Sequence, residues 1–344
     1  MTFQADAFPA CTETAFAAPV SASDLARVGR IGGERMVRLR PRHGDGVCEA
    51  RVRFALYGAA GAPVVIVQGG ISADRDASAR GQGWWEEVVG RGLPIDTGRF
   101  SVLAIDWLDR SDLDAVRAVG SEDQADALAA VLDSLGIGQV AAYVGASYGA
   151  MVGLAFAIRH PARLRHLVAI AGAHRAHPLS TALRNVQRDI VRLATRLGDS
   201  RSGLDLARRL AMTTYRGERE FAERCAGAPA FDGERFRFAE EAWLAHAGAR
   251  FAESFDVARF LALSESIDLH AVAPEDLRVP CTLIGISSDR VVPLADLCEL
   301  QRRAGAPAVM HVLDSRYGHD AFLKEPARIG VLLHDALDRA GACR

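Results

Sequence analysis

The sequence predicts an α/β fold in which a mostly parallel sheet is covered by helices on both faces and carries an inserted helical lid. Short, almost continuously apolar segments alternate with helical patterns along most of the chain, which is typical of parallel strands buried on both faces. Between residues 175 and 270 amphipathic helical patterns replace the strands. We therefore expect a core formed by residues 31–174 and 271–344, with the insertion at 175–270 lying over the carboxyl edge of the strands.

The individual elements follow from local patterns. Residues 1–30 lack sustained periodicity and are expected to form a loosely held arm. Residues 36–40 and 47–58 flank a turn at His43-Gly44-Asp45-Gly46 and predict a β-hairpin. The apolar residues of 121–136 recur at helical spacing. Six further strands are expected at 63–70, 100–106, 139–145, 164–172, 280–289 and 308–315.

Composition excludes several classes of protein. Of the 344 residues 49% are apolar, and the net charge is −2, so there is no basic excess for nucleic acid. No run of 18 apolar residues is present to span a membrane, and residues 1–20 do not resemble a secretion signal. The six cysteines are scattered without a C-x-x-C pair. This pattern predicts a cytoplasmic protein without a disulfide framework or zinc site.

Gly145, Ser147 and Gly149 form a G-x-S-x-G pattern between a predicted strand and a helix rich in small residues. In this setting the pattern is a nucleophile elbow, in which a tight turn exposes the serine and the neighbouring positions must be small. A tight strand-to-helix packing turn is the alternative. We expect Ser147 to be a nucleophile.

A serine nucleophile needs a base and an acid that orients it, and in this fold they follow in the order serine, acid, histidine. His319 lies in the polar loop after the last predicted strand and is the expected base. Asp289 ends the preceding strand and is the expected acid, although a capping aspartate is an alternative. Asp268 and Asp314 are weaker candidates for the acid. His270, His311 and His334 are disfavoured as the base; His311 and His334 lie inside predicted elements.

The tetrahedral intermediate of acyl transfer needs two backbone N–H groups to hold its oxyanion. One is expected from Tyr148, directly after the nucleophile. The other is expected from Ile71, in a loop where Gly69 and Gly70 allow close approach. Together these residues predict a serine-based acyl-transfer enzyme of the α/β-hydrolase fold.

With these residues placed, the chain resembles the homoserine O-acyltransferase family over about residues 45–335. The segments that carry the resemblance are GGISA (69–73), VGASYGAMVGLAFAIRHP (144–161), ALRNVQRDIVRL (182–193), AMTTYRGEREF (211–221), VARFLALSESIDLH (257–270), SSDRVVP (287–293) and YGHDAFLKE (317–325). The resemblance implies that an acyl group passes from a coenzyme A thioester to serine and then to an amino-acid hydroxyl. It implies the triad Ser147, Asp289 and His319, with no metal or redox cofactor.

The same resemblance implies that Arg216 and Asp320 hold the amino acid. Homoserine is a zwitterion, so its carboxylate suits a guanidinium and its ammonium suits a carboxylate. A salt bridge within the insertion is the alternative role for Arg216, and a helix cap is the alternative for Asp320. The expected small-molecule substrates are therefore an acyl-CoA and L-homoserine, and the resemblance favours a homodimer.

Arg184 indicates which acyl group the donor carries. Relatives that use acetyl-CoA commonly have asparagine at this position of an F-N-x-V-x-R pattern, whereas this chain reads L-R-N-V-Q-R. An arginine there is suited to the terminal carboxylate of a succinyl group, although a solvated arginine is the alternative. The expected activity is therefore homoserine O-succinyl transfer from succinyl-CoA. Acetyl-CoA as donor, serine as acceptor, ester hydrolysis and a non-enzymatic binding protein remain the alternatives.

Overall fold

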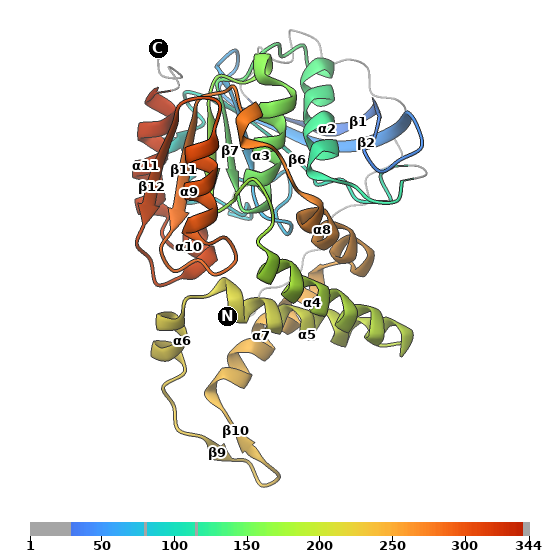
Figure 1. Ribbon diagram of the computed structural model, residues 1–344, viewed down its shortest axis with the longest axis vertical. Helices are drawn as coiled ribbons and strands as arrows, with labels where there is room; N and C mark the ends of the chain where they lie inside the picture. The colour runs from blue at the N-terminus through green and yellow to red at the C-terminus, as the bar shows by residue number, and fades with distance from the viewer. Residues whose placement is uncertain (1–28, 79–80, 114–115, 340–344) are drawn as a thin grey trace.

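An eight-stranded sheet forms the core of the protein (Figure 1). The computed structural model describes residues 29–78, 81–113 and 116–339. Strand β2 runs antiparallel to both its neighbours and the other adjacent pairs are parallel, in the order β1-β2-β6-β3-β7-β8-β11-β12. The mostly parallel α/β sheet is thus confirmed. Its strands are β1 (Gly29–Leu39), β2 (Cys48–Gly58), β3 (Val64–Gln68), β6 (Ser101–Ile105), β7 (Ala142–Ala146), β8 (Leu167–Ile170), β11 (Cys281–Ile286) and β12 (Ala308–Leu313).

Helices cover both faces of the sheet because alternate residues of its apolar strands point in opposite directions. On β3, Ile66 packs into the same buried cluster as Leu128 of α2 (Ser121–Ser134). Helices α3 (Tyr148–Arg159) and α9 (Leu294–Arg303) pack into this cluster as well. The neighbouring Val65 joins the cluster on the opposite face, with Leu333 of α11 (Pro326–Arg339). This double burial explains why the strands read as continuous apolar runs.

The predicted β-hairpin is confirmed as β1 and β2, whose residues pair from Gly29 with Gly58 to Leu39 with Cys48. Strand β1 begins seven positions earlier than the predicted segment, which started at Met36. Two residues assigned to the expected arm at 1–30 therefore belong to the sheet, and residues 1–28 lie outside the described residues.

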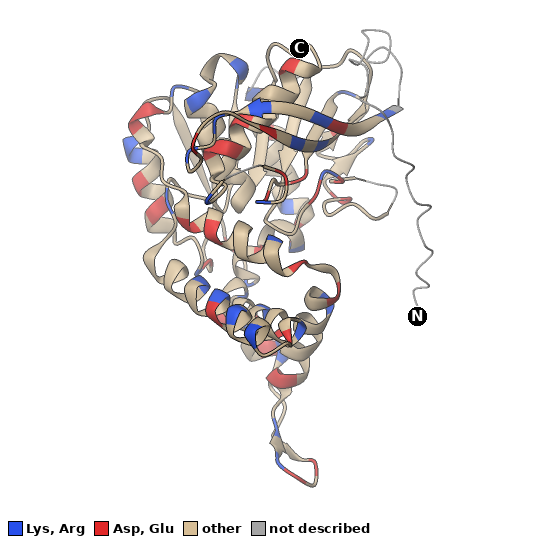
Figure 2. Ribbon diagram, turned by 90° about the vertical axis from the view of Figure 1, so that its right-hand side faces the viewer, with Lys and Arg blue, Asp and Glu red and all other residues tan. Residues whose placement is uncertain are grey.

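Five helices form the insertion between β8 and β11, at one end of the sheet in Figure 1. They are α4 (Pro178–Arg196), α5 (Ser200–Tyr215), α6 (Glu218–Arg224), α7 (Ala239–Ser254) and α8 (Val257–Leu269). The expectation that this region lacks strands is wrong at one place. Strands β9 (Ala230–Phe231) and β10 (Phe236–Arg237) pair as a short hairpin that projects away from the helices in Figure 2. The Asp232-Gly233 pair between them is the local signal for this turn.

Helix α4 faces the core with its polar side. Arg184, Gln187 and Arg188 are buried, together with Ser180 and Val191. The apolar residues of the sequence stripe largely face outward, and four apolar residues of the helix and its C-cap are exposed: Leu179, Val186, Leu193 and Leu197. The orientation is the reverse of that of an ordinary surface helix, which buries its apolar stripe.

The remaining elements are short. Strands β4 (Val89–Gly90) and β5 (Ile95–Asp96) pair outside the main sheet, and α10 (Ala321–Lys324) precedes α11. A membrane-spanning helix needs about 20 predominantly apolar residues, and no helix in the described ranges satisfies that requirement.

Candidate active site

Ser147 lies in a strained turn between β7 and α3. Its backbone has φ 56° and ψ −119°, a conformation that costs free energy for a residue with a side chain. The flanking glycines explain how the turn closes. A Cβ atom on Gly145 would lie 2.3 Å from the Gly149 carbonyl oxygen, and one on Gly149 would lie 2.2 Å from the Gln68 carbonyl oxygen. The G-x-S-x-G pattern is therefore required by the close approach of two strands and a helix.

Ser147, His319 and Asp289 form a continuous hydrogen-bonded chain. The Ser147 Oγ lies 2.7 Å from the His319 Nε2, and the His319 Nδ1 lies 2.7 Å from the Asp289 Oδ2. A carboxylate can only accept, so Nδ1 carries the proton and Nε2 of the neutral ring accepts from the serine hydroxyl. This arrangement allows the imidazole to remove the serine proton as the hydroxyl attacks a carbonyl.

Asp289 is held in place from two directions. Its side chain is 0% exposed, and its Oδ1 accepts hydrogen bonds from the backbone amides of Val291 at 2.8 Å and Val292 at 2.9 Å. The aspartate thus organises the turn after β11 while its other oxygen faces the histidine. The two weaker acid candidates lie elsewhere: Asp268 pairs with arginines of α4, and Asp314 accepts from the Ser287 hydroxyl.

The loop that carries His319 is fixed by contacts with the insertion. Gly318 has φ +61°, and a Cβ atom there would lie 2.6 Å from the Tyr215 carbonyl oxygen at the end of α5. The Tyr215 ring also lies 5.5 Å from the imidazole of His319, measured between centroids. The other histidine candidates do not reach Ser147. His270 bonds to Ser121 and His311 lies within β12.

The two predicted oxyanion-hole residues lie beside the serine. Ile71 and Ser147 both line one cavity, and Tyr148 is the first residue of α3. Among the described residues, neither the Ile71 amide nor the Tyr148 amide has a backbone hydrogen-bond partner. Both groups are therefore available to a ligand. The Tyr148 side chain points away to bond with the Ser266 hydroxyl at 2.5 Å.

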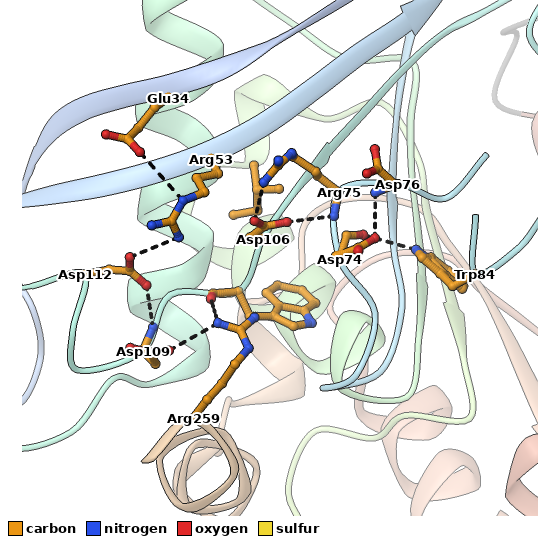
Figure 3. Close-up of polar contacts among 12 residues, drawn as sticks. Glu34, Arg53, Asp74, Arg75, Asp76, Trp84, Asp106, Asp109, Asp112 and Arg259 are labelled. Atoms are coloured by element: carbon orange, nitrogen blue, oxygen red, sulfur yellow. Dashed lines mark hydrogen bonds and ion pairs between the residues drawn. The ribbon is translucent and has the colours of Figure 1, made fainter. Parts of the chain in front are cut away.

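The loop that carries Ile71 is anchored to the end of β6 (Figure 3). The Asp106 carboxylate accepts from the Arg75 backbone amide at 2.9 Å and from the Arg75 guanidinium at 2.5 Å. Trp84 donates from its indole nitrogen to the Asp74 carbonyl oxygen at 3.2 Å. These contacts hold the loop beside the serine, and no sequence pattern predicts this role for Asp106.

A second group of polar contacts joins the segment after β6 to helix α8, as Figure 3 also shows. Arg259 donates to the Trp107 carbonyl oxygen at 2.9 Å and to the Asp109 carboxylate at 3.2 Å. Arg53 of β2 pairs with Asp112 at 3.5 Å. Charge pairing therefore ties this segment to the insertion.

The serine opens into a cavity of about 160 Å³ between the core and the insertion. This volume is smaller than that of ligand pockets that enclose drug-sized molecules, which is about 300–1,000 Å³. Its ionisable lining residues are Arg184, Arg208, His319 and Asp320.

Arg184 lines this cavity, but much of its guanidinium is already engaged. Its Nε and Nη2 lie 2.8 Å and 2.6 Å from the Asp268 Oδ1. The other Asp268 oxygen pairs with Arg188 at 2.7 Å. Two buried arginines therefore share one buried carboxylate and carry one net positive charge beside the cavity.

Comparison with known proteins agrees with this geometry. Residues 62–326 match the family model of the alpha/beta hydrolase fold. The chain is 45% identical to a homoserine O-succinyltransferase of Xanthomonas campestris pv. campestris, over 93% of this chain and 87% of that protein. The chain belongs to the homoserine O-acyltransferase family. A serine O-succinyltransferase of Xanthomonas campestris pv. campestris (strain B100) is 32% identical, over 84% of this chain and 92% of that protein.

Solved structures show the same fold. A homoserine O-acetyltransferase from Bacillus anthracis superposes with a TM-score of 0.79, covering 90% of this chain and 97% of that chain. Its sequence identity is 16%, so this likeness concerns the fold alone.

Two residues that the family resemblance implicates, Arg216 and Asp320, face each other. The Arg216 Nε lies 3.1 Å from the Asp320 Oδ2, although it is not aligned for a hydrogen bond. The Arg216 Nη1 also lies 3.4 Å from the Glu220 carboxylate. Asp320 lines the cavity and Arg216 does not. The structure thus brings the two residues together as an ion pair beside the site.

One charged residue of the cavity in this homoserine O-acyltransferase homologue is not predicted by any sequence pattern. Arg208 on α5 lines the cavity, whereas the adjacent Arg209 pairs with Asp205 at 2.5 Å. The sequence alone does not show which of these two adjacent arginines lines the cavity. Successive residues of a helix point in different directions, and only Arg208 points to the cavity.

Proposed function

We propose that the protein is a homoserine O-succinyltransferase that works through an acyl-serine intermediate. The observation that carries this proposal is the hydrogen-bonded chain from Ser147 through His319 to Asp289, which opens into a small cavity lined by arginines. The 45% identity to a homoserine O-succinyltransferase supports the same conclusion. Succinyl-CoA is a co-substrate, and no metal or redox cofactor takes part in this mechanism.

The proposed reaction has two halves. His319 takes the Ser147 proton while Oγ attacks the thioester carbonyl, and the Tyr148 and Ile71 amides stabilise the oxyanion. The carbon–sulfur bond then breaks, and His319 returns the proton to the departing thiol. In the second half His319 takes the proton of the homoserine hydroxyl, whose oxygen attacks the succinyl-serine. The serine–acyl bond breaks, Ser147 is reprotonated, and O-succinylhomoserine leaves.

Arg216 and Asp320 are proposed to bind the amino acid by opening their ion pair. A zwitterionic acceptor placed between them offers a carboxylate to Arg216 and an ammonium group to Asp320. Each buried charge then keeps an opposite partner, so neither is left uncompensated. The long, poorly aligned contact between the two side chains supports this exchange.

The pH dependence of the first half reaction tests the role of His319. Burial of the imidazole disfavours its charged form, but the Asp289 carboxylate and the nearby Asp320 outweigh this effect and raise the His319 pKa. Since only the neutral ring accepts the serine proton, the rate of CoA release should rise with pH through a midpoint above the ordinary histidine value of about 6.5. Stopped-flow measurement of the CoA burst reports this midpoint.

The variant Asp320→Asn removes one of the charges that raise the His319 pKa, so it should shift the midpoint to lower pH. Asp314→Asn serves as the control, because that carboxylate bonds to Ser287 and is remote from the imidazole. A midpoint that stays unchanged or moves to higher pH in Asp320→Asn would count against this electrostatic account.

Arg184 is proposed to recognise the terminal carboxylate of the succinyl group. With Arg184→Ala we expect kcat/KM for succinyl-CoA to fall about 10- to 100-fold relative to acetyl-CoA, which corresponds to a charge-assisted hydrogen bond of about 1.5–3 kcal/mol. Arg192→Ala is the matched control, because Arg192 lies on the same helix and is exposed. An unchanged succinyl preference in Arg184→Ala would remove this role from the proposal.

Steady-state assays with acetyl- and succinyl-CoA against serine and homoserine decide between the proposal and its alternatives. We expect the highest kcat/KM for succinyl-CoA with homoserine. Serine acceptance is the main alternative, because the acceptors differ by one methylene, worth only about 1–3 kcal/mol, and a serine O-succinyltransferase is among the relatives. Acyl-enzyme turnover that homoserine does not accelerate would instead indicate an esterase. Absence of any acyl adduct would indicate a binding protein.

We further propose that the protein is a homodimer formed through the insertion. Leu179, Val186 and Leu193 are exposed on α4 at seven-residue intervals, which is the spacing of a helix–helix seam. Light scattering should give the mass of two 36.9-kDa chains. Leu193→Glu should give a monomer, whereas Val331→Glu on α11, also exposed, should leave the dimer intact. A wild-type monomer would contradict this proposal.

The cytoplasm is the proposed location. The substrates named above are metabolites of the cell interior, and a reducing compartment suits the thiols. Cys225, Cys281 and Cys298 form no disulfide in the structure.

A further inference from the structure

Trp107 donates a hydrogen bond to the backbone beside the nucleophile. It lies just after β6 and is 1% exposed. Its indole Nε1 lies 2.9 Å from the carbonyl oxygen of Gly70, which accepts the hydrogen bond. Gly70 borders the reacting hydroxyl, because a Cβ atom on it would lie 3.9 Å from the Ser147 Oγ. No step of the proposed acyl transfer uses this buried indole.

The Gly70 carbonyl and the Ile71 N–H belong to the same peptide group. In a planar trans peptide the carbonyl and the N–H point in opposite directions. A hydrogen bond that fixes the Gly70 oxygen therefore also fixes the direction of the Ile71 N–H. That N–H has no backbone hydrogen-bond partner among the described residues. The bond to the oxygen also polarises the peptide group, which makes its N–H a stronger donor.

The indole of Trp107 is itself held from several sides. Its ring packs edge to face against the Tyr148 ring, with the centroids 4.9 Å apart and the planes at 70°. Its carbonyl oxygen accepts from Arg259 of α8 at 2.9 Å. The backbone of the next residue, Leu108, forms two hydrogen bonds with the Gln124 side chain on α2. Core and insertion together thus fix the indole before any substrate binds.

We propose that Trp107 is a positioning residue for the oxyanion hole. Its indole N–H holds the peptide group between Gly70 and Ile71 so that the Ile71 N–H points to the oxyanion of the tetrahedral intermediate. This inference rests on the proposed function, which requires that intermediate on Ser147. The Ala73 amide also donates to the Gly70 oxygen, at 3.0 Å. Loss of the indole N–H therefore leaves the peptide group less firmly oriented but still bonded.

The first test variant is Trp107→Phe, which removes the N–H and keeps an aromatic ring beside Tyr148. The maximal rate of the CoA burst with succinyl-CoA should fall about 10- to 100-fold, less than the 10²- to 10³-fold lost when an oxyanion donor is itself removed. The succinyl-CoA concentration that gives half the maximal burst rate should change by less than about twofold. The reason is that the oxyanion forms only as the thioester is attacked, after binding.

Binding of propylboronic acid gives a second readout that does not depend on turnover. The boron atom bonds to a serine oxygen and becomes tetrahedral, so one of its hydroxyl groups occupies the oxyanion position. In Trp107→Phe its affinity should weaken by about the same factor as the burst rate. If Trp107→Phe does not fold, Trp107 is replaced by benzothienylalanine, in which sulfur takes the place of the N–H in a ring of the same shape. The same losses are expected.

Trp85→Phe is the matched control. Trp85 is also buried, and its indole N–H donates to the Phe322 carbonyl oxygen at 3.0 Å, which is outside the oxyanion loop. This variant loses the same kind of bond, so its melting temperature should fall by an amount comparable to that in Trp107→Phe. Its burst rate and its affinity for propylboronic acid should match those of the wild type.

An unchanged burst rate or an unchanged boronic acid affinity in a folded Trp107 variant would overturn the role of Trp107. Equal losses in Trp85→Phe would overturn it as well, because they would reflect general loosening of the core. The wild type separates this inference from the proposed function. A wild type that shows neither a CoA burst nor a boronic acid adduct contradicts the function itself. A wild type that shows both, while the Trp107 variant behaves identically, contradicts only the inference about Trp107.

Discussion

Replacing Ser147 by alanine should reduce acyl transfer by about 10⁶-fold, the size of effect found when a triad nucleophile is removed. The Ser147 Oγ is the atom that forms the bond to the acyl group in the proposed mechanism. Once it is removed, the base His319 has no serine hydroxyl to deprotonate. Alanine retains the Cβ atom, so the strained backbone at φ 56° changes little and the fold should persist. Intact-protein mass spectrometry after mixing with succinyl-CoA should show an adduct on the wild type alone.

Ser134→Ala is the control for this experiment, because Ser134 is on α2 and bonds to the Val131 carbonyl oxygen, remote from the cavity. Circular dichroism checks that both variants are folded. Transfer that survives in Ser147→Ala would show that the acceptor attacks the succinyl-CoA thioester directly, without the acyl-serine.

Replacing Asp289 by asparagine should reduce kcat by about 10⁴-fold while the protein remains folded. The reason lies in the two oxygens of the aspartate. Oδ1 accepts from the Val291 and Val292 amides, and an asparagine oxygen can keep those bonds. The amide nitrogen then faces the His319 Nδ1 and donates to it, which forces the ring proton onto Nε2. In that tautomer the ring donates to Ser147 and cannot take its proton.

Asp314→Asn is the control for Asp289→Asn, because Asp314 follows β12 and bonds to the Ser287 hydroxyl without reaching the histidine. The decisive measurement is kcat together with the melting temperature. A variant with near wild-type kcat would mean that Asp289 serves only the turn, as a capping residue does.

The nucleophile elbow and the positions of the acid and base could be predicted because local chemistry dictates them. Gly145 and Gly149 permit the turn around Ser147, and the ends of β11 and β12 bring Asp289 and His319 to the same edge of the sheet. Because the strands that precede these three residues run parallel, their carboxyl ends lie at the same edge of the sheet. The three side chains can therefore form the hydrogen-bonded chain described above.

The surroundings of the serine could not be predicted in the same way, because they depend on contacts distant in sequence. The apolar stripe of α4 is visible in the sequence, but its outward orientation is not. That orientation goes with the ion pairs that Arg184 and Arg188 of the opposite side form with Asp268 of α8. The stacking of Arg208 on Phe251 of α7 has no local signal either. The cavity-lining residues of the inserted helices therefore cannot be identified from local sequence patterns alone.

The contact between Gly318 and the end of α5 has a consequence for the newly made chain. Ser147 and His319 are 172 residues apart, and the histidine loop is seated against Tyr215 of the insertion. A chain whose insertion has not docked lacks the contact that seats the histidine loop, so nothing from α5 holds His319 beside the Ser147 hydroxyl. Under the proposed mechanism, such immature molecules would leave acyl-CoA unreacted, and acylation of Ser147 would require the completed fold.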